Sequence, residues 1–275
     1  MTKYIFRAIF NPLYGLYILA KKYIIRYEGF SYSFKKNGEE YLLDKLISSD
    51  IKTVFDVGAN IGNWTEIAHK KFSNSTIHAF EISEKTFKVL KRRYQDNSQI
   101  VLNNFGLSDK SGEFEYKDYG KNSGVNSLIL DSDFHDSQIK SKILKTMIDI
   151  GDEYCLNNNV HSIDFLKIDV EGAEHLVLGG FTNLLKSGKI KVIQFEYGYT
   201  HADAKFLIKD FYKLFNSFEY VLGPLKPSGV IFMDFDYALN DFNSGPNYVA
   251  VHKNQIEIIN SIKGKPIKGF PRLKY

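Results

Sequence analysis

Short apolar runs alternate with segments of helical periodicity along the chain from Ile51 onward. Between the runs, apolar residues recur every three or four positions, as at Trp64, Ile67, Ala68 and Phe72. This alternation is typical of βαβ units, so we expect an α/β fold whose mostly parallel sheet has helices on both faces and antiparallel pairing at one edge. Strands are predicted at 53–57, 75–80, 100–102, 163–170, 191–196, 220–222, 230–232 and 248–251.

The helices between these strands carry their own sequence signals. Ser83 is predicted to cap the helix after the second strand, because its hydroxyl can accept a hydrogen bond from a free backbone N–H. Two further helices are predicted over residues 173–185 and 204–215, each with its apolar residues on one face.

The alternation is interrupted between the third and fourth of these strands. Gly112–Tyr116 predicts a hairpin strand, and residues 117–148 are then polar, rich in Ser, Asn and Asp, and only weakly periodic. An insertion of this length inside a compact domain is usually functional. We therefore expect residues 117–148 to form a lid or a substrate loop within a single domain that spans residues 37–255.

The two ends of the chain differ from this domain in charge. Residues 1–27 and 258–275 together hold ten basic residues and no acidic one; since the whole chain has a net charge of +4, the 230 residues between them carry −6. A negative body argues against nucleic acid as a partner, which needs a basic face along its phosphates. We expect an aromatic, basic helical extension over residues 1–36 and a basic tail over 256–275. These ends are either solvated or meet an anionic membrane surface or a phosphorylated substrate.

The N-terminal extension does not predict a membrane span. Its longest run without charge, Ala8–Ala20, is interrupted by Asn11, Pro12 and Gly15, whereas a spanning helix needs ~20 apolar residues. No small-residue cleavage site follows, as a signal peptide would require. The extension is expected to pack on its own domain, to pack in a homodimer, or to lie in a membrane interface.

The composition is that of a globular protein of the reducing cytoplasm. Of the 275 residues, 44% are hydrophobic and 25% are charged, which argues against disorder as the main state. Cys155 is the only cysteine, so no intramolecular disulfide can form. A cytoplasmic location is expected, with peripheral contact at the inner face of the membrane if the extension binds lipid.

The first strand ends in a glycine-containing turn, residues 58–62, that precedes a helix. In open α/β sheets ligands bind outside the carboxyl ends of the strands, and Gly58 lets the backbone approach a ligand closely. A dinucleotide-binding fold would have a second glycine where this chain has Asn60, so the pyrophosphate fingerprint is missing. The turn is expected to accept a nucleoside-like ligand, although glycine also ends strands for structural reasons alone.

Polar residues end the second and third strands as well. Glu81 should lie beside Gly58 at the same edge of the sheet, where its carboxylate can accept hydrogen bonds from both hydroxyls of a ribose. Asn104, Ser108 and Asp109 could contact the edge of an adenine, although this pattern is also ordinary turn chemistry. Taken together, the glycine turn at 58–62 and Glu81 predict adenosine binding.

Acidic residues gather after the fourth strand, in the segment IDFLKIDVEGAE at 163–174. Because buried carboxylates are costly unless they are paired or bound to a ligand, Asp169 and Glu171 are predicted to be catalytic or ligand-binding. Glu196 ends the fifth strand and His201 follows it. Asp169 and Glu196 suit general-base catalysis or, alternatively, oxygen ligation of Mg²⁺, and the metal question stays open.

Four segments together resemble FkbM-type methyltransferases: FDVGANIG, HAFE, the N-x-G-L-S-D turn at 104–109 and, above all, IDFLKIDVEGAE. The resemblance extends from about residue 37 to residue 251. It implies a Rossmann-like class I fold with a seven-stranded sheet in the order 3-2-1-4-5-7-6, and methyl transfer from S-adenosylmethionine, usually to a hydroxyl.

The resemblance also assigns roles by position. The turn after the first strand would hold the methionine end of the cofactor, the second strand end its ribose and the third strand end its adenine, while the acids of the fourth strand would face the acceptor. The cofactor-binding residues implied are Asp56, Gly58, Ala59, Asn60, Gly62, Asn63, Glu81, Ile82, Asn104, Ser108, Asp109 and Asp169, and Asp169 and Glu171 are those that would face the acceptor.

The working hypothesis is that Asp169 takes or relays the proton of the acceptor while Glu196 or His201 positions the acceptor. The acceptor is expected to be a sugar hydroxyl in surface polysaccharide or glycolipid biosynthesis, a pathway in which members of the resembled family often act. A secondary-metabolite hydroxyl is the nearest alternative. Two readings from other classes are a catalytically inactive, membrane-associated binding protein of the same fold and a nicotinamide-dependent oxidoreductase, which Asn60 disfavours.

Overall fold

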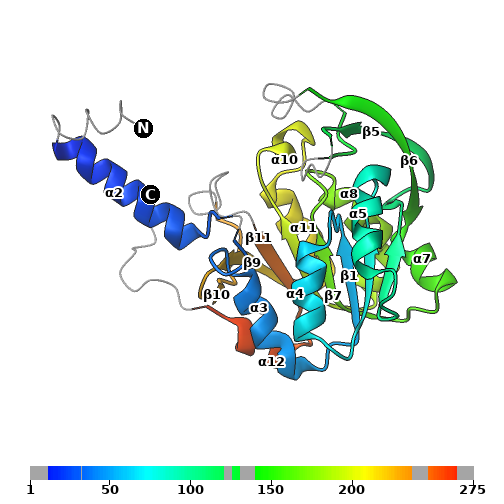
Figure 1. Cartoon of the computed structure of the whole chain (residues 1–275). Coiled ribbons are helices and arrows are strands. Elements are labelled where there is room, and N and C mark those ends of the chain that lie inside the picture. Colours follow the sequence, from blue (N-terminus) through cyan, green and yellow to red (C-terminus); the bar gives the residue numbers. More distant parts are fainter. Residues whose placement is uncertain (1–11, 32, 121–125, 131–139, 237–246, 265–275) are drawn as a thin grey trace.

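A computed structural model describes the chain except residues 1–11, 32, 121–125, 131–139, 237–246 and 265–275 (Figure 1). Its largest sheet has the strand order β10-β9-β11-β8-β7-β1-β2-β3. The neighbours from β3 to β8 pair in parallel, while β11 pairs antiparallel with both β8 and β9. The strands are β1 Thr53–Val57, β2 Thr76–Phe80, β3 Ile100–Asn103, β7 Ile163–Ile168, β8 Ile190–Glu196, β9 Tyr220–Lys226, β10 Gly229–Val230 and β11 Asn247–His252.

This topology confirms the α/β class and the expected strand order. When β7, β8, β9 and β11 are taken as the fourth to seventh strands, the sheet reads 3-2-1-4-5-7-6 from β3 to β9. The described sheet has eight strands rather than the expected seven. The additional strand is β10, whose Gly229 and Val230 pair with Lys226 and Leu225 at the edge.

The sheet separates two apolar cores. In β1, Val54 belongs to one core and Phe55 and Val57 to the other, because successive side chains of a strand point to opposite faces. Helices on each face close these cores, which gives a three-layer arrangement (Figure 1). On the Val54 face lie α3 Glu39–Leu46, α4 Asn63–Lys71, α5 Glu84–Tyr94 and α12 Ile256–Ile262; on the other lie α7 Gly151–Asn157, α8 Glu174–Gly180, α9 Thr182–Lys186 and α11 Ile208–Ser217.

Most helices follow the periodicity of the sequence, with two exceptions. Ser83 caps α5 as predicted, since its Oγ accepts a hydrogen bond from the backbone N of Thr86. The helix predicted over 173–185 is divided at Phe181, where glycines at 179 and 180 end α8; a Cβ on Gly180 would lie 2.1 Å from the carbonyl oxygen of Ser108. The helix predicted over 204–215 begins only at Ile208, because Lys205 adopts a left-handed φ of 56° after the short helix α10, Thr200–Asp203.

A second, three-stranded sheet lies beyond the carboxyl edge of the first, in the order β4-β6-β5. It consists of β4 Gly106–Ser108, β5 Gly112–Asp118 and β6 Lys142–Ile150. The predicted hairpin strand is β5, but the expectation of an irregular segment from 117 to 148 is wrong at both ends. In β6, Ile148 is buried, whereas Ile143 and Met147 are exposed. Because the apolar residues of this strand do not all face the core, its sequence resembles that of an irregular loop. The lid or substrate role stays a prediction, because residues 121–125 and 131–139 lie outside the described part.

The two ends of the chain behave differently. Helix α2, Pro12–Glu28, occupies the predicted N-terminal extension and projects from the domain (Figure 1). The predicted tail at 256–275 is wrong for its first part, because α12 buries Ile258 and Ile262 in the core beside α3; the part from 265 onward lies outside the described residues. Within the described residues, the structure contains no helix with the length and apolar character needed to cross a bilayer.

Candidate functional site

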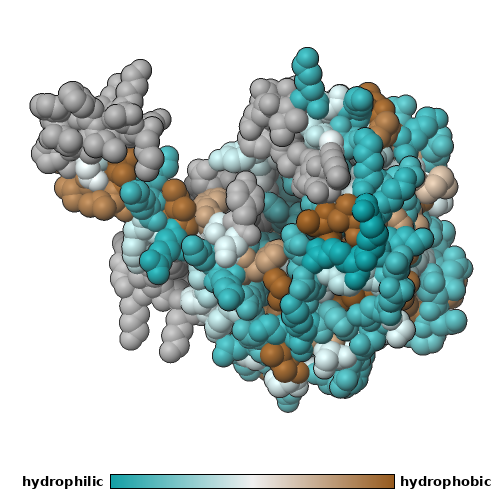
Figure 2. Space-filling model, in the orientation of Figure 1, coloured by the Kyte–Doolittle hydropathy of each residue, from teal (hydrophilic) through white to brown (hydrophobic). Residues whose placement is uncertain are grey.

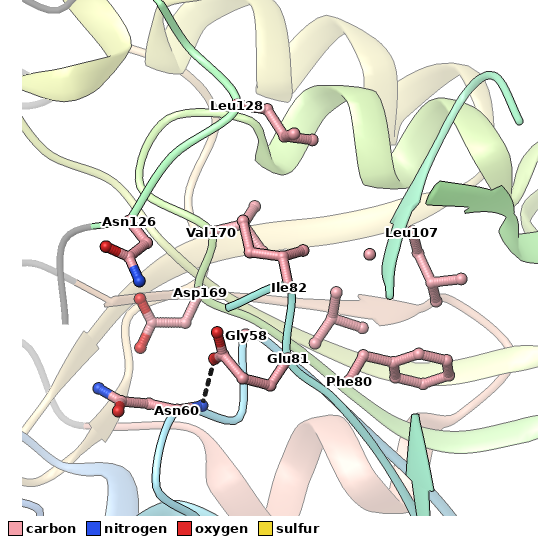
Figure 3. Close-up of a pocket in the computed structure, with 12 residues that line it drawn as sticks. Gly58, Asn60, Phe80, Glu81, Ile82, Leu107, Asn126, Leu128, Asp169 and Val170 are labelled. Atoms are coloured by element: carbon pink, nitrogen blue, oxygen red, sulfur yellow. Dashed lines mark hydrogen bonds between the residues drawn. The ribbon is translucent and has the colours of Figure 1, made fainter. Parts of the chain in front are cut away.

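A cavity opens at the carboxyl ends of β1, β2 and β7, where the sequence predicts the ligand (Figure 3). Five of the predicted site residues line it: Gly58, Asn60, Glu81, Ile82 and Asp169. The parallel strands explain this meeting, because the register places the ends of β1, β2 and β7 side by side. The other lining residues are Val57, Phe80, Gly106, Leu107, Asn126, Leu128 and Val170.

Gly58 forms the floor of the cavity. Its φ is +86°, and a Cβ at this position would lie 1.9 Å from the carbonyl oxygen of Asp169. The backbone N–H groups of Gly58 and Ala59 both donate to the carbonyl oxygen of Phe80, at 3.0 and 2.8 Å. The turn is therefore held between β2 and β7 in a conformation that glycine adopts without strain.

Glu81 is a buried carboxylate anchored by two backbone donors. Its Oε2 accepts from the N of Asn60 at 3.0 Å (Figure 3), and its Oε1 accepts from the N of Ser83 at 2.8 Å. Burial raises the pKa of Glu81 to about 7, although the two hydrogen bonds act in the opposite direction. Asn60 itself adopts a φ of +49°, which asparagine tolerates, and its buried Oδ1 has no hydrogen-bond donor among the described residues.

Asp169 is ion-paired with a buried lysine. The Nζ of Lys167 lies 2.8 Å from Oδ2 of Asp169 and 5.7 Å from the centre of the Trp64 ring. Burial lowers the pKa of Lys167, but the negative charges of Asp169, Asp56 and Glu39 outweigh it and raise the pKa above its usual value. Lys167 is therefore a permanent cation, and it stabilises negative charge on Asp169 at the cavity wall.

Glu196 lies against Asp169 and is linked to it by a hydrogen bond. Burial raises the pKa of Glu196 well above its usual value, and the negative charges of Asp169 and Glu171 add to the effect, as does a hydrogen bond to Asp169. The raised pKa favours the protonated form of Glu196, which can donate its proton in the hydrogen bond to Asp169. Glu196 therefore holds the carboxyl group of Asp169 in place at the cavity wall.

The loop that carries Glu171 is held by a buried carboxylate. Glu174 accepts hydrogen bonds from the N of Val170 and the N of Gly172, both at 2.9 Å. Glu171 has a left-handed φ of 55°, and its carbonyl oxygen accepts from the Oγ of Ser127 at 2.7 Å. This loop places Glu171 close enough to Glu196 for their charges to interact.

The predicted role of His201 in positioning the acceptor is not supported by its location. Its side chain is fully buried; Nε2 lies 2.9 Å from Oε2 of Glu174, outside hydrogen-bond alignment, and Nδ1 accepts from the N of Gly198 at 3.2 Å. His201 therefore contacts Glu174, the residue that holds the loop, and does not line the cavity. Of the two candidates for positioning an acceptor, Glu196 is the one beside the cavity.

Four predicted residues of the first turn stand outside the cavity lining. Asp56 is completely buried and accepts a hydrogen bond from Oγ1 of Thr65 at 2.6 Å. It therefore links β1 to α4 on either side of the turn. Ala59 is buried in the core, and Gly62 packs against the ring of Tyr94. The Oδ1 of Asn63 accepts from Arg93 at 2.9 Å on the surface.

The residues predicted to contact adenine, Asn104, Ser108 and Asp109, lie outside the cavity lining. Ser108 and Asp109 face the glycines of α8, while Gly106 and Leu107 line the cavity. Asn104 uses its Nδ2 to donate to the carbonyl oxygen of Glu81 at 2.8 Å. Gly106 and Leu107 belong to the N-x-G-L-S-D turn, in which the sequence predicts ligand contacts only for the polar residues.

Two lining residues come from the segment in which the sequence shows no motif. Asn126 and Leu128 lie over the cavity opposite Gly58, with the amide of Asn126 directed toward Asp169 (Figure 3). The Oδ1 of Asn126 accepts from the N of Tyr119 at 3.0 Å, which fixes the amide, and its buried Nδ2 has no partner among the described residues. This orientation leaves a hydrogen-bond donor free for a ligand.

The site does not fit a Mg²⁺ ion. In the part of the chain that the structure describes, no group of three or more His, Cys, Asp and Glu side chains is placed to hold a metal. Asp169, the first expected ligand, already pairs through Oδ2 with the ammonium group of Lys167, which also repels a cation. The carboxylates are better suited to proton transfer than to metal ligation.

The chain is similar to several known methyltransferases. The chain is 28% identical over 174 residues to the hexuronic acid methyltransferase AglP of Haloferax volcanii, and 26% identical over 161 residues to methyltransferase 1 of Beauveria bassiana. The two matches cover 62% and 52% of this chain and 65% of each relative, so the chain spans less than two thirds of the curated relatives' length. A solved FkbM methyltransferase from Methylobacillus flagellatus is 14% identical, with a TM-score of 0.43, over 74% of this chain and 44% of that one.

A family model decides the assignment. The model of the methyltransferase FkbM domain matches residues 56–222, which is more than half of the chain and includes the glycine turn, Glu81 and the acidic strand end. The chain therefore belongs to the FkbM family of S-adenosylmethionine-dependent methyltransferases.

Proposed function

We propose that the protein is an O-methyltransferase that methylates a sugar hydroxyl in surface polysaccharide or glycolipid biosynthesis. The observation that carries the proposal is the position of Asp169, which lines the cofactor cavity beside Gly58 while Lys167 stabilises its negative charge. A general base at this point suits a hydroxyl acceptor, whose oxygen must lose a proton. The relative named as a hexuronic acid methyltransferase supports a sugar as the acceptor class.

The cavity offers complementary groups for each part of S-adenosylmethionine. The carboxylate of Glu81 would accept hydrogen bonds from the ribose hydroxyls, and the unpaired Oδ1 of Asn60 would accept one from the α-ammonium group. Gly106 and Leu107 would form an apolar slot for the adenine, with Ile82 beside them. The cofactor supplies a methyl group on a positively charged sulfur.

Asp169 would accept the proton of the acceptor hydroxyl as the new oxygen–carbon bond forms and the carbon–sulfur bond breaks, with S-adenosylhomocysteine as the other product. Glu196 would hold Asp169 in place through the hydrogen bond between the two carboxyl groups, and Asn126 would donate a hydrogen bond from its free Nδ2 to the acceptor oxygen, so that this oxygen is held in line with the methyl group. Such positioning alone contributes ~7–11 kcal/mol to lowering a barrier.

Cofactor affinity should depend on pH through Glu81. Folding raises the pKa of Glu81 from 4.5 to about 7, so the unliganded fold loses stability as the pH rises from 4.5 to about 7. The ribose hydroxyls need the ionised carboxylate of Glu81 to accept their hydrogen bonds. S-adenosylhomocysteine should therefore bind about tenfold more weakly at pH 6 than at pH 8. Calorimetry across this range tests the expectation. Glu81→Gln should bind weakly at every pH; an identical pH dependence in that variant would remove Glu81 from the ribose site.

The acceptor class can be tested by methyl transfer from labelled S-adenosylmethionine to a panel of hydroxyl compounds. Nucleotide-linked and lipid-linked sugars should be labelled, and phenolic or polyketide hydroxyls should not. Mass spectrometry after glycosidase treatment would locate the label on a sugar oxygen. Labelling of only the second group would favour the secondary-metabolite alternative, and labelling of a carboxyl or amine group would contradict O-methylation.

A further inference from the structure

We infer that α2 is a docking helix that lies in the interface of an anionic membrane. The inference goes beyond methyl transfer and does not depend on it, because it concerns a helix outside the matched family domain.

An exposed apolar stripe runs along α2. Five large apolar residues on it are between 52% and 74% exposed, and they follow the spacing i, i+3, i+4, i+10, i+11, with an exposed alanine at i+7. This spacing places all six on one face of a helix. The stripe consists of Leu13, Leu16, Tyr17, Ala20, Tyr23 and Ile24.

The stripe is continuous, unlike the isolated apolar residues found on most protein surfaces. Hydrophobic side chains of α2 are visible on the part of the molecule that projects from the domain (Figure 2). A contiguous exposed apolar face marks an interaction site, whereas single exposed residues such as Leu156 need no explanation. Two tyrosines belong to the stripe, and aromatic rings with a polar tip are favoured at the level of lipid headgroups.

The charges around the stripe select an anionic lipid surface. Lys21, Lys22 and Arg26 are exposed and fall outside the stripe, as do the exposed Leu19 and Ile25. The three cations can reach headgroups while the stripe enters the acyl boundary. Residues 1–27 contain five basic residues and no acidic one. Each basic residue near such a surface adds to the attraction.

A second copy of the chain fits the same face less well. Pairing two stripes would bring together two segments that each carry five positive charges and no negative one. The stripe also covers only two heptads, fewer than a stable coiled coil uses. Charge complementarity therefore favours the membrane over self-association.

Flotation of the full chain with lipid vesicles tests this inference. Wild type should float with vesicles of 30% phosphatidylglycerol in phosphatidylcholine and float far less with phosphatidylcholine alone. Leu16→Ser combined with Ile24→Ser should weaken binding to the anionic vesicles at least tenfold. Lys21→Gln, Lys22→Gln and Arg26→Gln together should abolish the preference for phosphatidylglycerol.

Leu156→Ser is the control, because it removes an exposed leucine from α7, outside the stripe, and should leave flotation unchanged. Circular dichroism would show that all variants keep the folded domain, and light scattering would report their oligomeric state. Absence of wild-type flotation, or equal flotation by the Leu16→Ser and Ile24→Ser variant, would overturn the inference. So would a dimer that this double substitution dissociates while vesicle binding persists.

Discussion

Replacing Asp169 by asparagine is expected to lower turnover by about 10²- to 10³-fold, the loss typical when a general base is removed. The substitution keeps the shape of the side chain, and the amide oxygen can still accept a hydrogen bond from Lys167. Affinity for S-adenosylhomocysteine should therefore change by no more than about threefold, since the effect falls on proton transfer and not on binding. Single-turnover methyl transfer and calorimetry on the same preparation measure the two quantities separately.

The same strand provides a matched control at its other end. Asp164 also pairs with a lysine, Lys191 at 2.7 Å, and accepts hydrogen bonds from the backbone N of Lys52 and of Thr53. Asp164→Asn should lower the melting temperature but leave the turnover of the folded enzyme within about twofold, because it lies at the amino end of β7. Normal turnover in Asp169→Asn, or an equal loss in Asp164→Asn, would show that Asp169 is not the base.

Replacing Lys167 by methionine should destabilise the fold by about 3–5 kcal/mol, the range for a buried charge network that loses one partner. Three carboxylates that interact with this ammonium group, on Asp169, Asp56 and Glu39, would lose their common cation. Urea unfolding followed by circular dichroism gives the free energy. Lys145→Met is the control, because its ion pair with Glu113 is exposed to solvent and its loss should change the free energy of unfolding far less.

A second substitution can identify the network as the cause. Glu39 is buried on α3, where it accepts hydrogen bonds from Gln194 at 2.7 Å and Asn37 at 2.6 Å. Burial raises its pKa, and the charge of Lys167 opposes this. Glu39→Gln should therefore recover part of the stability in the Lys167→Met background while destabilising wild type. If the two substitutions changed the free energy of unfolding by strictly additive amounts, an electrostatic link between α3 and the site would be contradicted.

The sequence predicted those features that depend on neighbouring residues. Strand runs such as 53–57 and 75–80 are mostly buried because both faces of the sheet are covered, and the glycine at 58 is required by a φ that other residues avoid. Since the carboxyl ends of parallel strands lie at one edge of the sheet, the sequence alone predicts that Gly58, Glu81 and Asp169 lie close together.

The remaining features depend on contacts between distant parts of the chain. The pairing of Glu39 with Gln194 joins residues 155 positions apart, and the positions of Asn126 and Leu128 over the cavity depend on how the second sheet docks. The prediction for His201 rests on its position after β8, but its side chain is buried beside Glu174. Ser108 was predicted to contact adenine because polar residues in a turn resemble ligand contacts, but it faces a glycine of α8, and Gly106 and Leu107 line the cavity instead.

Titration calorimetry with S-adenosylhomocysteine tests the cofactor site most directly, using NAD as the control ligand and Glu81→Ala as the control variant. Wild type should bind S-adenosylhomocysteine in the micromolar range, Glu81→Ala should bind at least tenfold more weakly, and neither should bind NAD. If folded wild type binds NAD or fails to bind S-adenosylhomocysteine, or if Glu81→Ala binds it as tightly as wild type does, the cavity beside Gly58 is not the cofactor site described above.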